Sequence, residues 1–373
     1  MKGHIAGVFF IIFIGPIGND GWQDPQNDEI DLNKAQDFEF TSAPGAPDLI
    51  EMLSEYGDSR NNWDMARKYM RTIKLYHGQV TKQTNPDILH TINGNTLERL
   101  ANTGSIRNIN KDFGIKLALE IGAMKDHSCL YSEYDLKRAV DLVVDSVEEV
   151  YKAGGAVHRL DIDTSLADHC RATLNDVGFF VGKFIMQTQD AIDLKLAELE
   201  SKYPDIRSAT IDWAEIEPYP FRSIWEHARY LDKLQRDLNS RGYRPLKAYF
   251  LDIDHRLVED IVLARDFHNF LMIGHALGVE VGIIINGDDE DIKNPWLNKD
   301  LEYLRTANDK LARFKELGIL DEADIIMVQS WAAEANGNRT VPRNVPETAI
   351  THTNFFIHVL KCAANLVDCS AYP

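Results

Sequence analysis

Sequence signatures that would point to a cofactor are missing from this chain. No Gly-x-Gly-x-x-Gly or Walker-type loop follows any of its apolar runs, which argues against an open sheet that binds a dinucleotide or a nucleotide. No Cys-x-x-Cys, His-x-His or His-Glu-x-x-His pattern occurs either, so metal sites built on those patterns are not expected. We expect a protein that works without a metal and without a cofactor.

Positive charge is also scarce. The 373 residues include 40 Lys and Arg against 58 Asp and Glu, which gives a formal net charge of −18 at pH 7. Because this excess of acid would repel a phosphate backbone, nucleic acid is not an expected partner. A neutral or positively charged ligand fits better.

Long apolar runs are limited to one, at the start of the chain. Met-Lys-Gly-His is followed by apolar residues 5–14, a run too short to span a bilayer comfortably. This pattern predicts a secretory signal peptide over residues 1–18, with an uncleaved anchor or a buried first helix as alternatives. Residues 19–37 are rich in Asp, Asn and Gln, which is typical of a flexible leader. We expect a secreted protein, extracellular or periplasmic, with no membrane contact after removal of the signal.

Cysteine is sparse but even in number, at four residues. An even count suits an oxidising compartment and disulfide bonds. Three pairings are possible, and we favour Cys129 with Cys170 and Cys362 with Cys369, because each bond would tie neighbouring loops or the tail.

Short apolar runs predict eight β-strands. The runs are residues 38–41, 72–76, 115–121, 157–163, 208–220, 246–254, 279–285 and 323–329. Most alternate with predicted helices that stop at Gly or Pro, over residues 64–70, 134–153, 182–203, 224–241, 257–277 and 301–317, and with a helical stretch inside 85–113. This alternation is typical of an α/β protein with a (β/α)8 TIM barrel, here a single catalytic domain over residues 38–373. A doubly wound open sheet is the competing architecture.

Polar residues stand at the carboxyl ends of these runs. In a parallel barrel the strand ends share one face, so their side chains converge at one mouth whatever their separation in sequence. The residues concerned are His77, Gln79, Glu120, Asp161, Asp163, Glu215, Glu217, Asp252, Asp254, Asn286, Gln329 and Trp331. Like charges raise one another's pKa, and a protonated carboxyl group beside an ionised one is what glycoside hydrolysis requires. Asp161 and Asp252 lie one step deeper, where Lys, Arg or backbone donors could satisfy them.

The stretch 208–220 shows this pattern most clearly. It places Glu215 and Glu217 two residues apart before two prolines, so both carboxylates share one face as the strand ends. A pair of acids at a solvated strand end would give the same pattern. Aromatic residues near the strand ends, among them Tyr76 and Trp331, could offer flat faces to sugar rings.

Several phrases of the sequence resemble a known kind of protein. They are Ile-Lys-Leu-Tyr, Leu-Ala-Leu-Glu-Ile-Gly, Ile-Glu-Pro-Tyr-Pro, Gly-Ile-Ile-Ile-Asn-Gly, Val-Gln-Ser-Trp and Val-Pro-Glu-Thr-Ala-Ile-Thr-His-Thr. With these phrases in order over about residues 38–360, the chain resembles secreted bacterial TIM-barrel proteins of glycoside-hydrolase type. The resemblance implies a barrel with a saccharide-facing mouth and fixes no substrate.

The sequence departs from the large clan of retaining glycosidases, which has its acid/base Glu after strand four and its nucleophile Glu at the end of strand seven. Here those strands end in Asp163 and Asn286. We predict instead that Glu217 is the general acid, because neighbouring apolar rings would raise the pKa of a Glu at the rim. Asp163 is then the nucleophile or the base that activates water, and Glu120 and Asp254 are alternatives for that second role.

The residues together predict a glycoside hydrolase that cleaves a poly- or oligosaccharide with paired carboxylates. The predicted substrate contacts are Glu215, Asn286, Gln329, Trp331, Tyr76, Gln79 and His352. A non-catalytic carbohydrate-binding barrel is an alternative from another class. A polysaccharide lyase is a third, although a lyase normally needs a basic cluster and this mouth is acidic.

Overall fold

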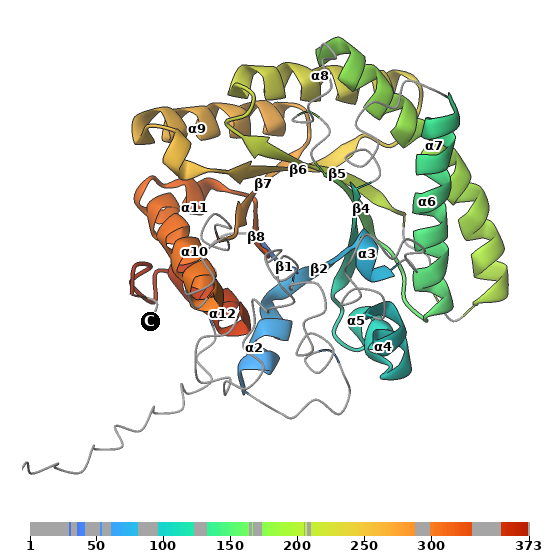
Figure 1. Cartoon of the computed structure of the whole chain (residues 1–373), viewed down its shortest axis with the longest axis horizontal. Coiled ribbons are helices and arrows are strands. Elements are labelled where there is room, and N and C mark those ends of the chain that lie inside the picture. The colour runs from blue at the N-terminus through green and yellow to red at the C-terminus, as the bar shows by residue number, and fades with distance from the viewer. Residues whose placement is uncertain are drawn as a thin grey trace, which may run out of the picture. The chain divides into compact units, whose positions relative to one another are not determined.

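The computed structural model describes residues 30, 36–41, 53, 61–80, 96–122, 133–163, 166, 174–204, 206, 210–287, 299–329 and 352–371. Eight strands form one closed parallel barrel, in which each strand pairs with the next and β8 pairs with β1 (Figure 1). The strands are β1 (Asp37–Thr41), β2 (Met70–Tyr76), β3 (Lys116–Ile121), β4 (Arg159–Asp163), β5 (Asp212–Tyr219), β6 (Leu246–Ile253), β7 (Glu280–Ile285) and β8 (Ile325–Gln329). The barrel lies within the compact unit Leu32–Pro373, and it confirms the predicted fold.

Helices surround the barrel (Figure 1). They are α2 (Asn61–Tyr69), α3 (His77–Val80), α4 (Thr96–Asn102), α5 (Ser105–Lys111), α6 (Glu133–Lys152), α7 (Leu174–Lys202), α8 (Ile224–Ser240), α9 (Asp260–Ala276), α10 (Lys299–Glu316), α11 (Ile319–Glu322) and α12 (His352–Ala363). The helix expected from Leu257 instead begins at Asp260, because Asp254 caps a separate 3-10 turn, η2 (His255–Leu257). The other predicted helices are present with shifted ends, and α7 begins at Leu174 rather than at Gly182. The helices α3, α11 and α12 were not predicted.

Strand register decides which side chains point into the barrel. The interior is filled by an apolar cluster from β5 to β8, namely Ala214, Ile216, Ala248, Phe250, Ile284, Ile325 and Met327. Side chains alternate along a strand, so the residues between these face the helices. Trp213 packs edge-on against Phe184 of α7, with 6.2 Å between ring centroids, and Tyr219 donates a hydrogen bond to Asp266 of α9. The odd-numbered residues of β5 therefore face outward, and its even-numbered residues face inward.

One charged cluster lies inside the barrel, at the level where β4 begins. Arg159 donates to both oxygens of Glu39, at 2.6 and 2.7 Å, and to both oxygens of Asp161, at 2.6 and 2.9 Å. Its guanidinium carbon also lies 5.0 Å from the centroid of the Phe250 ring. Burial raises the pKa of Glu39, and Arg159 opposes that shift. Asp161 is thus a structural carboxylate held by an arginine, as its deeper position in the strand predicted.

The carboxyl-terminal tail is tied by a disulfide bond. Cys362 in α12 is bonded to Cys369, with 5.1 Å between their Cα atoms, which confirms this predicted pair. Cys129 and Cys170 lie outside the described residues, as do the predicted signal peptide and most of the predicted leader. In the part of the chain that the structure describes, no helix has the length and apolar character of a membrane span.

Candidate functional site

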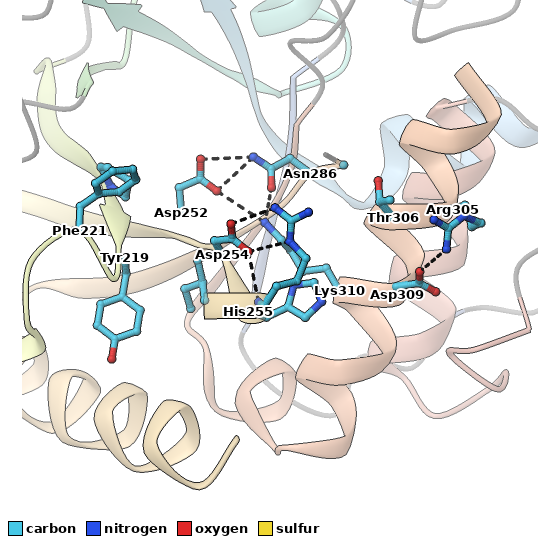
Figure 2. Close-up of a pocket in the computed structure, with 14 residues that line it drawn as sticks. Tyr219, Phe221, Asp252, Asp254, His255, Asn286, Arg305, Thr306, Asp309 and Lys310 are labelled. Carbon is cyan, nitrogen blue, oxygen red and sulfur yellow. Dashed lines mark hydrogen bonds and ion pairs between the residues drawn. The ribbon is translucent and has the colours of Figure 1, made fainter. Parts of the chain in front are cut away.

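A cavity of about 400 Å³, here called the mouth cavity, opens at the carboxyl ends of β6 and β7 beside α10 (Figure 2). Its polar lining includes Asp252, Asp254, His255, Arg256, Asn286 and Lys310. Tyr219 and Phe221 lie on the side away from α10. In (β/α)8 enzymes the active site is built from the loops at this end of the barrel, so the mouth cavity is the candidate site.

Three hydrogen-bonded side chains line one side of the mouth cavity. Asn286 Nδ2 donates to both oxygens of Asp252, at 3.1 and 3.3 Å, and Lys310 Nζ donates to Asn286 Oδ1. Lys310 Nζ also lies 3.6 Å from Asp252 Oδ1, while 33% of the Asp252 side chain remains exposed. An amide donor and a nearby ammonium group thus hold the Asp252 carboxylate in one orientation. Asp252 is therefore an oriented carboxylate that a ligand can reach.

Lys310 comes from a helix rather than from a strand end. It lies on α10 and is almost fully buried. Burial lowers the pKa of Lys310, and the nearby carboxylates of Asp252 and Asp254 oppose that shift. A buried ammonium group needs such partners to remain charged, so the lysine and the two acids depend on one another.

Asp254 lines the same cavity but is held in an ion pair. Arg256 donates to its two oxygens through Nε and Nη2, at 2.9 Å in each case. These hydrogen bonds lower the pKa of Asp254 and outweigh the effect of its partial burial. Asp254 is therefore an ionised acceptor. This state suits the base or nucleophile role for which it was an alternative, and does not suit a proton donor.

Another cluster of polar side chains, around Lys74, lies inside the barrel where β2, β3 and β8 end. Lys74, only 1% exposed, donates to Gln329 Oε1 at 2.9 Å and forms an ion pair with Glu120. Its Nζ also lies 5.5 Å from the centroid of the Tyr76 ring. Three predicted site residues are thus gathered around one lysine. Gln79, by contrast, is buried and accepts a hydrogen bond from the Tyr76 backbone N–H, so the structure gives it a role in the turn into α3 rather than in the mouth cavity.

Glu215 and Glu217 share one face of β5, as predicted, but that face is the outer one. Both side chains are 0% exposed. Tyr230 of α8 donates to Glu215 Oε1 at 2.6 Å, and the Leu166 backbone N–H donates to Glu217 Oε1. Burial raises the pKa of Glu217 well above its usual range, and the charges of Glu215 and Asp163 raise it further.

This placement corrects the predicted position of both residues. A general acid must come within hydrogen-bond reach of the leaving-group oxygen. Glu217 lies behind the barrel wall instead of at the mouth, and Glu215 likewise has no access to a ligand there. Neither residue is therefore placed to donate a proton to a ligand in the mouth cavity.

The remaining predicted residues are placed as follows. Asp163 ends β4 and is level with Ile216, so it faces the barrel interior, where it is half-buried. Trp331 lies outside the described residues, and so does the side chain of His352, the residue at which α12 begins. Among the residues that the structure describes, no group of three or more His, Cys, Asp or Glu side chains is placed to hold a metal ion.

Several residues of the mouth cavity were not predicted from the sequence, among them Phe221 and Lys310. Phe221 follows the end of β5 and is 67% exposed. Lys310 lies on a helix, whereas the predicted site residues were those at the carboxyl ends of strands. A signal for it exists in the sequence, because Lys310 falls on the same helical stripe as the buried residues Ala307 and Phe314.

Comparisons with known proteins found no matching family model and no matching curated protein. Solved structures do resemble the chain. A GH10 protein from Paenibacillus barcinonensis is 10% identical, with a TM-score of 0.49 and coverage of 92% of this chain and 97% of that one. The GH26 beta-mannanase BoMan26A from Bacteroides ovatus is 11% identical, with a TM-score of 0.45 and coverage of 90% and 91%.

A D-psicose 3-epimerase solved with D-fructose is also similar, at 10% identity and a TM-score of 0.46, with coverage of 89% of this chain and 100% of that one. Glycoside hydrolases and an epimerase are thus both among the structures that this chain resembles. Likeness at this level assigns neither a family nor an activity. The residues of the mouth cavity have to carry the functional assignment.

Proposed function

We propose that the chain is a glycoside hydrolase acting on a poly- or oligosaccharide, with Asp252 and Asp163 as its catalytic carboxyl groups. The observation that carries this proposal is the position of Asp252. Asp252 shares one cavity, at the carboxyl end of a (β/α)8 barrel, with the buried cation of Lys310 and the exposed aromatic ring of Phe221. Ligand sites of this kind pair an apolar surface with a few converging polar groups.

Asp252 is assigned the role of nucleophile or water-activating base. Lys310 and Asn286 orient its carboxylate, and both roles use a carboxylate oxygen. Asp163 is assigned the role of proton donor, because it faces the interior from β4 with only β5 between it and β6. Strands lie about 4.8 Å apart, so β4 and β6 are separated by about 10 Å and inward-pointing side chains come closer. A carboxyl separation of about 5 to 9.5 Å is what glycosidases use.

Contacts to the sugar are assigned to the surrounding side chains. The exposed ring of Phe221 offers a flat apolar face on one side of the mouth cavity, and Asp254 offers acceptors for hydroxyl groups on the other (Figure 2). Glu120 and Gln329, held by Lys74, would receive the part of the substrate that enters the barrel mouth. Trp331 and His352 remain predicted contacts.

The test is release of reducing sugar by the purified protein across a panel of plant, fungal and bacterial polysaccharides. Where one substrate is cleaved, Asp252→Asn and Asp163→Asn should each lower the rate by at least about a hundredfold. Asp145→Asn, an exposed carboxylate on α6, is the matched control and should leave the rate unchanged. Cleavage that survives Asp252→Asn would move the role to Glu120 or Asp254.

A carbohydrate-binding barrel without catalysis is the second candidate. It is favoured by the state of the other carboxylates, since Asp254 is paired with Arg256 and Glu120 with Lys74. A site whose acids are already neutralised by cations can hold hydroxyl groups without donating a proton. Binding of a glycan with no release of reducing sugar would support this candidate and reject the hydrolase.

Secretion is part of the proposal. The Cys362–Cys369 disulfide supports an oxidising compartment, since such bonds are rare in a reducing cytosol. Recovery of the native protein from the medium or periplasm, with a chain shortened at its amino terminus, would support an extracytoplasmic location. Retention in the cytosol at full length would contradict it.

A further inference from the structure

A second cavity, here called the amino-terminal cavity, lies at the opposite end of the barrel from the candidate site. Its volume is about 740 Å³. It is lined by α5, by the turn between α6 and β4, and by the end of α7 with the residues that follow. These segments lead into β3, β4 and β5, so they belong to the face where barrel strands begin. That face usually serves stability rather than catalysis.

The lining of the amino-terminal cavity is basic. It includes Arg107, Lys111 and Lys202, together with His158, and none of the lining residues that the structure describes is acidic. Within the described part of the chain, no acid forms an ion pair with any of these three cations. This is unusual in a chain with a net charge of −18, where acids are plentiful. Like charges grouped together destabilise a fold unless something neutralises them.

The wall of the amino-terminal cavity is ordered by hydrogen bonds. Asn110 donates to Ile115 O at 2.9 Å and accepts from Ala156 N at 3.0 Å, which links the end of α5 to the turn before β4. His158 Nδ1 lies 3.3 Å from Leu117 N and 3.1 Å from Ala156 O, so backbone groups fix its ring. The cations therefore surround a fixed hollow rather than a flat surface.

An aromatic face completes the lining. Tyr203 follows α7 and is half-buried, and the Lys202 ammonium group lies 5.4 Å from its ring centroid. The volume falls within the range of small-molecule sites, about 300 to 1,000 Å³, and is much larger than a single inorganic ion needs. A polar ring with anionic groups would fill the cavity and meet both the aromatic face and the cations.

We propose that the amino-terminal cavity binds a sugar-sized polyanion, a saccharide unit that carries carboxylate, sulfate or phosphate groups. Arg107, Lys111 and Lys202 bind the anionic groups, and His158 and Tyr203 bind the ring. Arginine suits this role because its planar guanidinium group binds oxyanions through two hydrogen bonds. The site is separate from the mouth cavity and does not depend on the function proposed there.

The test is isothermal titration of the full chain at low salt with three probes, namely digalacturonate, sucrose octasulfate and glucose 1,6-bisphosphate. These distinguish a carboxylated, a sulfated and a phosphorylated source of the charge. Maltose is the neutral probe, and inorganic phosphate tests the charge without the sugar. We expect at least one anionic sugar to bind, maltose not to bind, and inorganic phosphate to bind at least about tenfold more weakly than that sugar.

Matched variants place the binding in the amino-terminal cavity. Arg107→Gln with Lys202→Gln should weaken binding of the anionic sugar at least about tenfold. Arg229→Gln with Arg241→Gln removes two other exposed cations that form no ion pair with the described residues, and should change the affinity less than about twofold. All four side chains are exposed, so both variants should keep the parental unfolding temperature.

Three results would overturn the proposal. They are no binding of any anionic sugar, equal loss of binding in both double variants, and inorganic phosphate that binds as tightly as the best sugar. The last would show a site for a simple anion only. Loss confined to the Arg107 and Lys202 variant supports the proposal, whether or not the mouth cavity proves to be catalytic.

Discussion

Glu217 and Asp252 stand on adjacent strands but on opposite sides of the barrel wall. Glu217 is level with Leu251, so Asp252, one residue further along β6, faces the interior while Glu217 faces the helices. Glu217 is fully buried, and burial raises its pKa. Asp252 is 33% exposed and lies 3.6 Å from the ammonium group of Lys310. Burial favours the neutral form of the Glu217 carboxyl group, whereas the Asp252 side chain lies partly open to the mouth cavity beside a cation.

The buried carboxyl group of Glu217 predicts how stability depends on pH. Its pKa in the folded protein is raised, so its contribution to stability is fully present below the unfolded pKa of about 4.3 and is lost as pH rises through the folded pKa. Glu217→Gln mimics the protonated form and should not suffer this loss. Urea unfolding at pH 5 and pH 8 gives the free energy of unfolding of both proteins. From pH 5 to pH 8 this free energy should rise for Glu217→Gln relative to the parent by at least about 1.4 kcal/mol, the equivalent of one pKa unit.

Glu98→Gln is the control for this measurement, because Glu98 is an exposed residue of α4. Its free energy of unfolding should follow the parent at both pH values. A constant difference between Glu217→Gln and the parent from pH 5 to pH 8 would show that Glu217 is ionised in the folded protein.

Lys310 predicts the opposite dependence. Burial lowers its pKa in the folded protein, so its contribution to stability is present above the unfolded pKa of about 10.4 and is lost as pH falls through the folded pKa. Between pH 7 and pH 10 the parent should therefore become more stable relative to Lys310→Met. Urea unfolding at several pH values measures this, with the exposed Lys247→Met as control. Parallel curves for parent and Lys310→Met would contradict the prediction.

The interior cluster around Arg159 predicts a large loss of stability. Arg159→Met would leave Glu39 and Asp161 as buried carboxylates without a cation, at a cost of about 3 to 5 kcal/mol. Urea unfolding at pH 7 measures the loss. Adding Glu39→Gln and Asp161→Asn should recover a large part of it, because the buried charges are then gone. A single variant within about 1 kcal/mol of the parent would mean that the cluster is not needed for stability.

Sequence reasoning identified that Glu215 and Glu217 share a face, but could not identify which face. A strand exposed on one side alternates apolar and polar residues, and that alternation marks the buried side. Parallel barrel strands are covered on both sides and give no such mark. On β5, Trp213 on the outside and Ala214 and Ile216 on the inside are all buried. Side chains two residues apart on a strand share a face, which the sequence alone predicts. Whether that face is the inner or the outer one is decided by the register of β5 with β4 and β6.

The partners of the buried charges were equally out of reach. Arg159 binds Glu39 across 120 positions of sequence, and Lys74 binds Gln329 across 255. Which charged residues meet depends on barrel closure, which brings the first strand beside the last. Lys74 does carry a local signal, because a lysine in the middle of an apolar strand requires a buried partner. The strands themselves, by contrast, are visible as local runs, so the number and order of the strands could be predicted.

The Arg159 cluster and the apolar cluster beside it have a consequence for the passage of solutes. Together they occupy the axis of the barrel with side chains that are nearly all buried. Because side chains fill the barrel axis, a solute cannot pass through the barrel from one end to the other. A ligand of the proposed amino-terminal site would have to return to bulk solvent before it could enter the mouth cavity, so the two proposed sites would fill independently of one another.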